Sequence, residues 1–231
     1  VHNHRPREMK RSISQAQSLQ RLALSTAASV LLMLGCAREP ALTKEEFAKA
    51  ESLFADSCLI CHSNQEMQRG PIIDGLPAWY GKAQLEKFRD GVRGQNPENL
   101  SELLMGSARD RFIDDETIRL LSSYIADLPP KPHAKLVRGD SGRGQLIYGT
   151  CLLCHGAYGK GNERLRSPPL NILEDWYLLD QLRKFATGKR GYNPEDPYGI
   201  QMAYSLKGFN DQDLKDVVAY IQGFSETQEP Q

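Results

Sequence analysis

The sequence lacks a hydrophobic run that could comfortably span a membrane, and it has no surplus of basic residues. Its one long apolar segment, residues 22–35, has about 14 residues, where a spanning helix needs roughly 20. The 231 residues include 29 Lys and Arg against 29 Asp and Glu, and the mean hydropathy is −0.51. These values are typical of a soluble globular protein and argue against nucleic acid as a partner.

Cysteine and histidine are also scarce, with five of each in the chain. Four of the cysteines belong to two copies of a CxxCH motif, Cys58-Leu59-Ile60-Cys61-His62 and Cys151-Leu152-Leu153-Cys154-His155. Two alternatives are a four-thiolate zinc site and a thioredoxin-like redox pair. A four-thiolate zinc site would not explain why a histidine follows the cysteines in both motifs. CxxCH is the attachment site of a c-type haem: two thiols form thioethers with the porphyrin, and the adjacent histidine becomes the proximal iron ligand. Because the motif occurs twice, the sequence predicts two covalent haem c groups.

The start of the chain has the features of a secretory signal, predicted over residues 1–35. The apolar segment follows a basic stretch and ends in small residues, and Met9 is an alternative start that gives the usual proportions. Met33-Leu34-Gly35-Cys36 resembles the lipobox of bacterial lipoproteins, although Met33 stands where Leu is usual. We therefore expect lipidation of Cys36, with residues 36–42 as a tether; ordinary cleavage, which would discard Cys36, is the alternative.

Export agrees with the haem motifs, because c-type haem attachment occurs outside the bacterial cytoplasm. Loss of residues 1–35 removes 5 Lys and Arg and 1 Asp or Glu, which leaves 24 basic and 28 acidic residues. Residues 36–130 carry a net charge of −5 and residues 131–231 carry +1. Lys160, Arg164 and Arg166 follow the second motif, so we expect an acidic partner to dock at the second half.

A tandem duplication organises the mature chain. At an offset of 97 residues Trp79 pairs with Trp176, and the same offset relates many further positions, among them Leu85, Phe88, Gly91, Arg93, Gly94, Asn96, Pro97, Met105 and Phe112. The CxxCH motifs are 93 residues apart, so the second copy has four extra residues just after its histidine. We predict a first domain over residues 43–128, a proline-rich linker over 129–139, a second domain over 140–225 and a tail over 226–231.

Each copy is predicted to consist of helices joined by loops. Thr43 and Glu46 form a capping box before the first motif, and Asp140 with Ser141 begins the corresponding helix of the second copy. The apolar stripes of these and the later helices are predicted to form the core; they include Phe47, Ala50, Leu53, Phe54, Leu146, Ile147 and Tyr148. Closing helices begin at Asp114 or Asp115 in the first copy and at Asn210 in the second.

The sixth iron ligands follow from elimination. The mature chain has only three histidines, and His133 lies in the linker with no counterpart, so bis-histidine ligation of both haems is excluded. Met202 is the only methionine of the second copy. In the first copy Met67 follows His62 too closely to reach the opposite face of the macrocycle, and Met105 occupies the position equivalent to Met202. We therefore predict His62 and Met105 for one iron, and His155 and Met202 for the other.

These residues together resemble the class I cytochromes c, and the tandem arrangement resembles the two-haem cytochrome c4 group. The resemblance rests on CxxCH, a Pro loop, QLxxFxxGxRG, Met and a closing helix with Tyr, and it covers residues 43–224. It implies an all-α fold of two tandem class I cytochrome c domains. It also implies that the carbonyls of Pro71 and Pro168 accept hydrogen bonds from the proximal histidines. The first copy departs from the pattern, with Ser63 in place of the equivalent Gly156.

Four further repeated residues, Trp79, Trp176, Arg93 and Arg190, have two interpretations. They could hydrogen-bond the haem propionates, or the Trp residues could belong to the core while the Arg residues cap helix C-termini. The sequence favours neither interpretation.

The sequence and the resemblance together predict an electron-transfer protein, not an enzyme, in the periplasm and tethered to the membrane. Its expected partners are redox proteins, such as a quinol-oxidising complex and a terminal oxidase or reductase, with no small-molecule substrate. The alternatives are a fixed cytochrome subunit of a dehydrogenase or oxidase complex and a dihaem peroxidase. The peroxidase and a haem-based sensor need an iron that can open, against which two equivalent methionine ligands argue.

Overall fold

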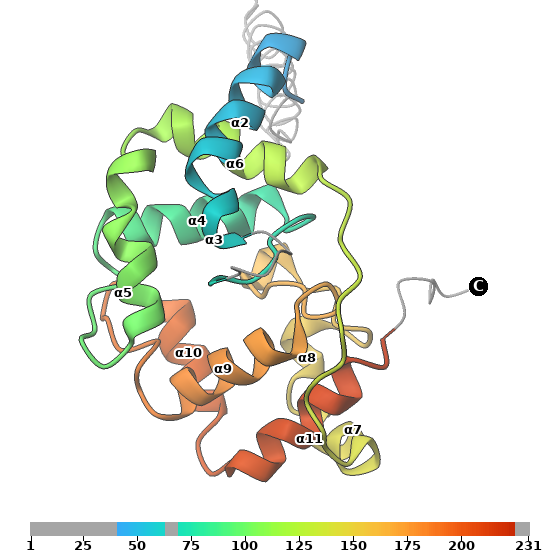
Figure 1. Ribbon diagram of the computed structural model, residues 1–231. Helices are drawn as coiled ribbons and strands as arrows, with labels where there is room; N and C mark the ends of the chain where they lie inside the picture. Colours follow the sequence, from blue (N-terminus) through green and yellow to red (C-terminus); the bar gives the residue numbers. More distant parts are fainter. Residues whose placement is uncertain (1–40, 63–68, 225–231) are drawn as a thin grey trace, which may run out of the picture. The chain divides into compact units, whose positions relative to one another are not determined.

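The computed structural model describes residues 41–62 and 69–224, which are helical with irregular connections (Figure 1). The described part of the first copy contains α2 (Lys44–Ser57), α3 (Leu59–His62), α4 (Ala78–Arg89), α5 (Leu100–Ser107), the 3₁₀ turn η1 (Arg109–Phe112) and α6 (Asp115–Asp127). Cys36, Met67 and the signal segment lie outside the described residues. No described helix combines the length and the apolar character needed to cross a membrane.

The second copy repeats the order of the α-helices, but its 3₁₀ turn lies after the CxxCH motif. It contains α7 (Ser141–Tyr148), α8 (Leu152–His155), the 3₁₀ turn η2 (Glu163–Leu165), α9 (Asp175–Ala186), α10 (Pro197–Ser205) and α11 (Asp211–Ile221). The only β-bridge among the described residues joins Asn162 to Ser167 in the segment after the second CxxCH motif. The all-α fold class predicted from the sequence is therefore confirmed.

In the first copy α2 and α4 pack against α6. The predicted capping box is present: the Thr43 side chain accepts from the Glu46 amide, and the Glu46 carboxylate accepts from the Thr43 amide. Asp114 caps α6 by accepting from the Thr117 amide. The apolar faces meet in a core in which Ile118 is fully buried, so the closing helix is the centre of this half.

In the second copy α11 holds the same place and packs against α7 and α9. Asp140 and Asn210 cap α7 and α11 as predicted. The prediction that Leu146 belongs to the core is wrong, because its side chain is 81% exposed. The face of α7 that meets α11 is formed by Gly144 and Tyr148, one turn apart, and Leu146 lies between them on the opposite face.

The connection between the copies, residues 129–139, contains no helix or strand, as its prolines predict. It is nevertheless held at several points. Lys131 pairs with the buried Asp74 at 3.0 Å, and the Val137 amide donates to Asp175 at 2.7 Å. The connection is therefore fixed to both copies.

Candidate functional site

Each CxxCH motif forms a single helical turn at the end of a longer helix. Cys58 is the C-cap of α2, and its carbonyl accepts from the amides of Cys61 at 3.1 Å and His62 at 2.9 Å. The second motif repeats this pattern with 3.2 and 2.9 Å. The turn keeps the two thiols of a motif one turn apart and the histidine directly after them. All four thiols are free of disulfides.

The first thiol of each motif lacks the environment of a redox-active cysteine. Burial raises the pKa of the Cys58 thiol to about 11, and burial likewise raises the pKa of Cys151. A reactive cysteine of the thioredoxin kind needs a lowered pKa. Among the described residues no group of three or more His, Cys, Asp and Glu side chains is arranged to hold a metal ion. The raised thiol pKa values argue against the redox-pair alternative.

The two motif histidines are oriented in the same way. His62 Nδ1 lies 2.7 Å from the Pro71 carbonyl oxygen, and His155 Nδ1 lies 2.9 Å from that of Pro168. A carbonyl can only accept, so Nδ1 carries the proton in both rings and Nε2 is left with its lone pair. Burial lowers the pKa of both histidines, which favours the neutral form that binds iron. The two contacts that the resemblance implied are thus present.

In the second copy Cys151, His155 and Met202 of α10 line one cavity of about 30 Å³. The rest of the wall is apolar: Ile147 from α7, Leu178 and Leu182 from α9, Leu214, Val217 and Ile221 from α11, and Leu170, Leu206 and Phe209 from the connections. Its walls offer the nitrogen and sulfur ligands and the apolar surroundings that a haem group would take.

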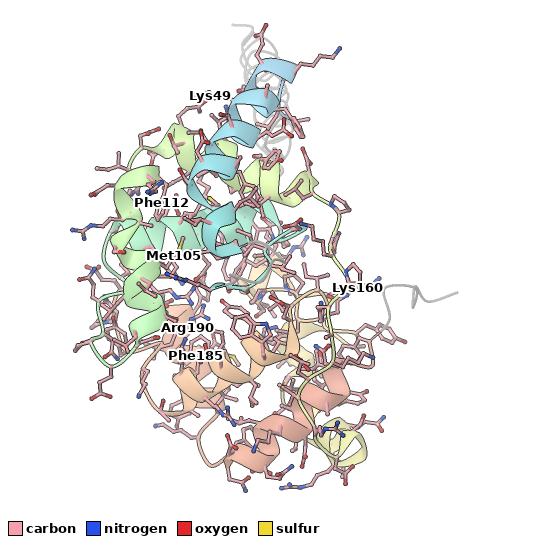
Figure 2. All side chains as sticks on the ribbon, in the orientation of Figure 1. Lys49, Met105, Phe112, Lys160, Phe185 and Arg190 are labelled. Carbon is pink, nitrogen blue, oxygen red and sulfur yellow. The ribbon has the colours of Figure 1, made fainter. Side chains whose placement is uncertain are left out.

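In the first copy Met105 lies on α5, half-buried against the core (Figure 2). Its helix is held close to the loop after α4, because a Cβ on Gly106 would lie 2.7 Å from the Gly94 carbonyl oxygen. Gly94 itself has φ +82°, a conformation that favours glycine. Met67, the competing candidate, is outside the described residues.

Two arginines and two glutamines, all repeated at the offset of 97, form a network that joins the copies. The Gln84 side-chain oxygen accepts from Arg93 at 2.8 Å and from Arg190 at 3.2 Å. That of Gln181 accepts from Arg190 at 2.6 Å and from Arg93 at 3.2 Å. Arg93 also pairs with Glu102 at 2.6 Å. Each glutamine therefore accepts hydrogen bonds from both arginines, and each arginine donates to a glutamine in both copies.

Both arginines retain one unused donor. Nε of Arg93 and Nε of Arg190 are buried without a hydrogen-bond partner, although the guanidinium groups stack on Phe88 and Phe185. Buried donors normally have an acceptor, and the carboxylates of a haem would be suitable ones. The backbone amide of Arg93 meanwhile bonds to the Lys87 carbonyl at the end of α4. Arg93 can therefore bond to the end of α4 through its backbone amide and to a haem propionate through its side chain.

The basic loop after the second motif is exposed at Lys160, Arg164 and Arg166, as a docking surface requires. The Arg166 guanidinium also lies 6.0 Å from the centre of the Trp79 ring, in the first copy. Arg166 thus contacts the other half of the chain.

Two features of the site were not found by sequence reasoning. The Gln84 and Gln181 pair was visible in the repeat, but only the fold brings the two glutamines together. No repeat pointed to Glu174, since the residue at the equivalent position of the first copy is Pro77. Its carboxylate, from the start of α9, accepts from the Ile72 amide at 2.8 Å.

Comparison with known proteins identifies the family. The Cytochrome c family matches the chain twice, over residues 47–129 and 141–225. The chain therefore belongs to the cytochrome c family and contains two such domains in tandem.

Particular relatives are similar over most of the described chain. Subunit FixP of the cbb3-type cytochrome c oxidase of Bradyrhizobium diazoefficiens is 25% identical over 170 residues, which is 68% of this chain and 57% of FixP. The thiosulfate dehydrogenase electron acceptor of Stutzerimonas stutzeri is 24% identical over 182 residues, 72% of this chain and 78% of that protein. The solved structure of Acidithiobacillus ferrooxidans cytochrome c4 has the same fold, with a TM-score of 0.59, 24% identity, and coverage of 72% of this chain and 98% of that one.

Proposed function

We propose that this chain is a dihaem electron carrier in which each copy holds one haem with the same residue types. The covalent attachment residues are Cys58 and Cys61 in the first copy and Cys151 and Cys154 in the second. His62 with Met105 would ligate one haem iron, and His155 with Met202 the other. The observation that carries this proposal is the cavity of the second copy, which brings Cys151, His155 and Met202 together within apolar walls.

A haem c group supplies, when bound, one-electron transfer between ferric and ferrous iron. The chain supplies the surroundings. The Pro71 and Pro168 carbonyls fix the orientation of the histidines. The apolar walls exclude water, and Arg93 and Arg190 offer their unused donors to propionates. With a histidine and a methionine bound to each iron, neither site would be open to a substrate.

We further propose that the protein works in the periplasm, tethered by a lipid on Cys36. Its partners would be membrane oxidoreductase complexes, among them a quinol-oxidising complex and a terminal oxidase or reductase. The similarity to an oxidase subunit and to a dehydrogenase electron acceptor supports redox proteins as partners.

The test begins with the holoprotein produced in a host that attaches haem c. Two haems per chain are expected, with full reduction by two electrons; one haem or none would overturn the proposal. Crosslinking in native membranes, followed by purification of the chain, is expected to capture a membrane oxidoreductase. Cys36→Ser should move the protein from the membrane fraction to the soluble periplasmic fraction, and wild-type protein found wholly in the soluble fraction would contradict the anchor.

A fixed subunit of an oxidase or dehydrogenase complex is the second candidate. It is favoured by the similarity to FixP, although the alignment covers only 57% of that subunit. Purification in mild detergent separates the two candidates. A fixed subunit would co-purify with a complex in constant ratio, whereas a carrier would elute free of it.

A further inference from the structure

One peptide group in the first copy is hydrogen-bonded at both of its ends. Its carbonyl oxygen, on Pro71, lies 2.7 Å from His62 Nδ1, and its N–H, on Ile72, donates to the Glu174 carboxylate at 2.8 Å. Glu174 is the N-cap of α9 in the second copy and is only 7% exposed. A carboxylate of one copy is thus linked to the proximal histidine of the other through a single peptide group.

Such a link has a predictable electronic effect. A carboxylate that accepts the N–H polarises the peptide and places more negative charge on its carbonyl oxygen. The carbonyl then accepts more strongly from His62 Nδ1, which makes Nε2 more basic and a stronger ligand of ferric iron. Because Glu174 is buried, its charge is screened much less than a surface charge would be. The effect through the hydrogen bonds and the direct electrostatic effect of the carboxylate both favour ferric iron.

The second copy lacks both parts of this link. The residue equivalent to Ile72 is Pro169, which has no N–H to donate. The residue equivalent to Glu174 is Pro77, which has no carboxylate. Both copies therefore retain the hydrogen bond from the histidine to the proline carbonyl. Only in the first copy does a carboxylate accept from the N–H of the same peptide group.

We propose that Glu174 is a positioning residue for the first haem, acting through the Ile72 amide and the Pro71 carbonyl on His62. By stabilising the ferric state it lowers the reduction potential of the first haem relative to the second. Electrons then occupy the second haem first, and the docking of the two copies sets the order. This inference rests on the proposed ligation of the first haem by His62.

The test is Glu174→Gln in the full holoprotein, which retains the size and an acceptor oxygen but removes the charge. We expect the ferric–ferrous equilibrium of the first haem to shift about tenfold toward ferrous, about 59 mV for a one-electron couple. The second haem should not move. Potentiometric titration measures the shift, and proton NMR assigns it, because each axial methionine methyl signal disappears separately in Met105→Ala and Met202→Ala.

Two further variants separate the link from a general charge effect. Ile72→Pro gives the first copy the Pro-Pro sequence of Pro168-Pro169 and removes the N–H. It should raise the same potential, and the double variant with Glu174→Gln should shift it by less than the sum of the two single changes. Glu195→Gln removes an exposed charge from the second copy and should shift neither haem.

Equal shifts of both haems, a first-haem shift no larger than that of Glu195→Gln, or additive effects of Ile72→Pro and Glu174→Gln would overturn the inference. Haem content and the signals of both methionine ligands distinguish this failure from failure of the proposed function. If both haems and both methionine signals are present while the potential does not move, only the role of Glu174 is wrong.

Discussion

The two copies share their candidate ligands but differ in what surrounds them. Both histidines donate to a proline carbonyl, yet only the first has a carboxylate beyond it, from Glu174. Both arginines bond to both glutamines, yet only Arg93 has an ion-pair partner among the described residues, Glu102. The difference shows how a duplicated domain can retain one chemistry while the contact between its copies makes the two sites unequal.

The largest expected effect comes from removing one sulfur ligand at a time. Met202→Ala should open only the second haem to carbon monoxide, and Met105→Ala only the first, because the other methionine is untouched. Optical spectra of the reduced variants with carbon monoxide measure this, with the wild type as a non-binding control. If Met105→Ala left the first haem unchanged while Met67→Ala altered it, the equivalence of the copies would be wrong at that ligand.

The second effect concerns the buried pair of Arg93 and Glu102. Glu102→Gln should lower the free energy of unfolding by about 3 kcal/mol, because it leaves a buried guanidinium without its counter-charge. Glu98→Gln, which removes an exposed carboxylate 3.9 Å from Lys189, is the matched control and should cost less than about 0.5 kcal/mol. Chemical denaturation at neutral pH measures both. Equal costs would show that the pair contributes little.

The same pair predicts a pH dependence. Burial alone would raise the pKa of Glu102, but the attraction of Arg93 and its hydrogen bond outweigh it, so the pKa lies below the ordinary value of 4.5. A lowered folded-state pKa gives stability that is complete above 4.5 and is lost as the pH falls through the folded-state value. Wild-type stability should therefore fall more steeply on acidification than that of Glu102→Gln, as thermal unfolding between pH 3 and 7 would measure. Parallel curves would contradict this.

A third change tests the contact between α7 and α11 in the second copy. A Cβ on Gly144 would lie 2.0 Å from the Asp216 carbonyl oxygen of α11, so Gly144→Ala should cost about 1–3 kcal/mol despite the better helix propensity of alanine. Gly142→Ala, on the same helix, meets only the Asp140 side chain at 3.3 Å and should be near neutral. Chemical denaturation compares the two, and equal effects would show that the α7–α11 contact can widen freely.

The smallest effect is expected at the surface of the second copy. Lys160→Glu with Arg164→Glu should slow electron transfer to an acidic partner a few-fold at low salt and little at high salt, because exposed charges are screened. Arg166 is left unchanged, since it contacts Trp79. An unchanged rate at low salt would place the docking surface elsewhere.

The sequence predicted the helices and the repeated ligands because these depend on local patterns. Capping residues such as Thr43 and Asn210 and the spacing of CxxCH carry their own signals. The contacts between the copies could not be predicted, since they depend on how two folded domains dock. The exposure of Leu146 followed from the close approach at Gly144, and the link through Glu174 has no counterpart in the repeat.

The most direct test of the account is a potentiometric titration of the wild-type holoprotein, followed in the visible range and at the near-infrared sulfur-to-iron charge-transfer band. Two one-electron steps at different potentials are expected, with a near-infrared intensity in the oxidised protein that fits two methionine-ligated haems. The haem with the lower potential should be the one whose methionine signal is lost in Met105→Ala. Two haems of equal potential, or a band that fits only one haem, would contradict it.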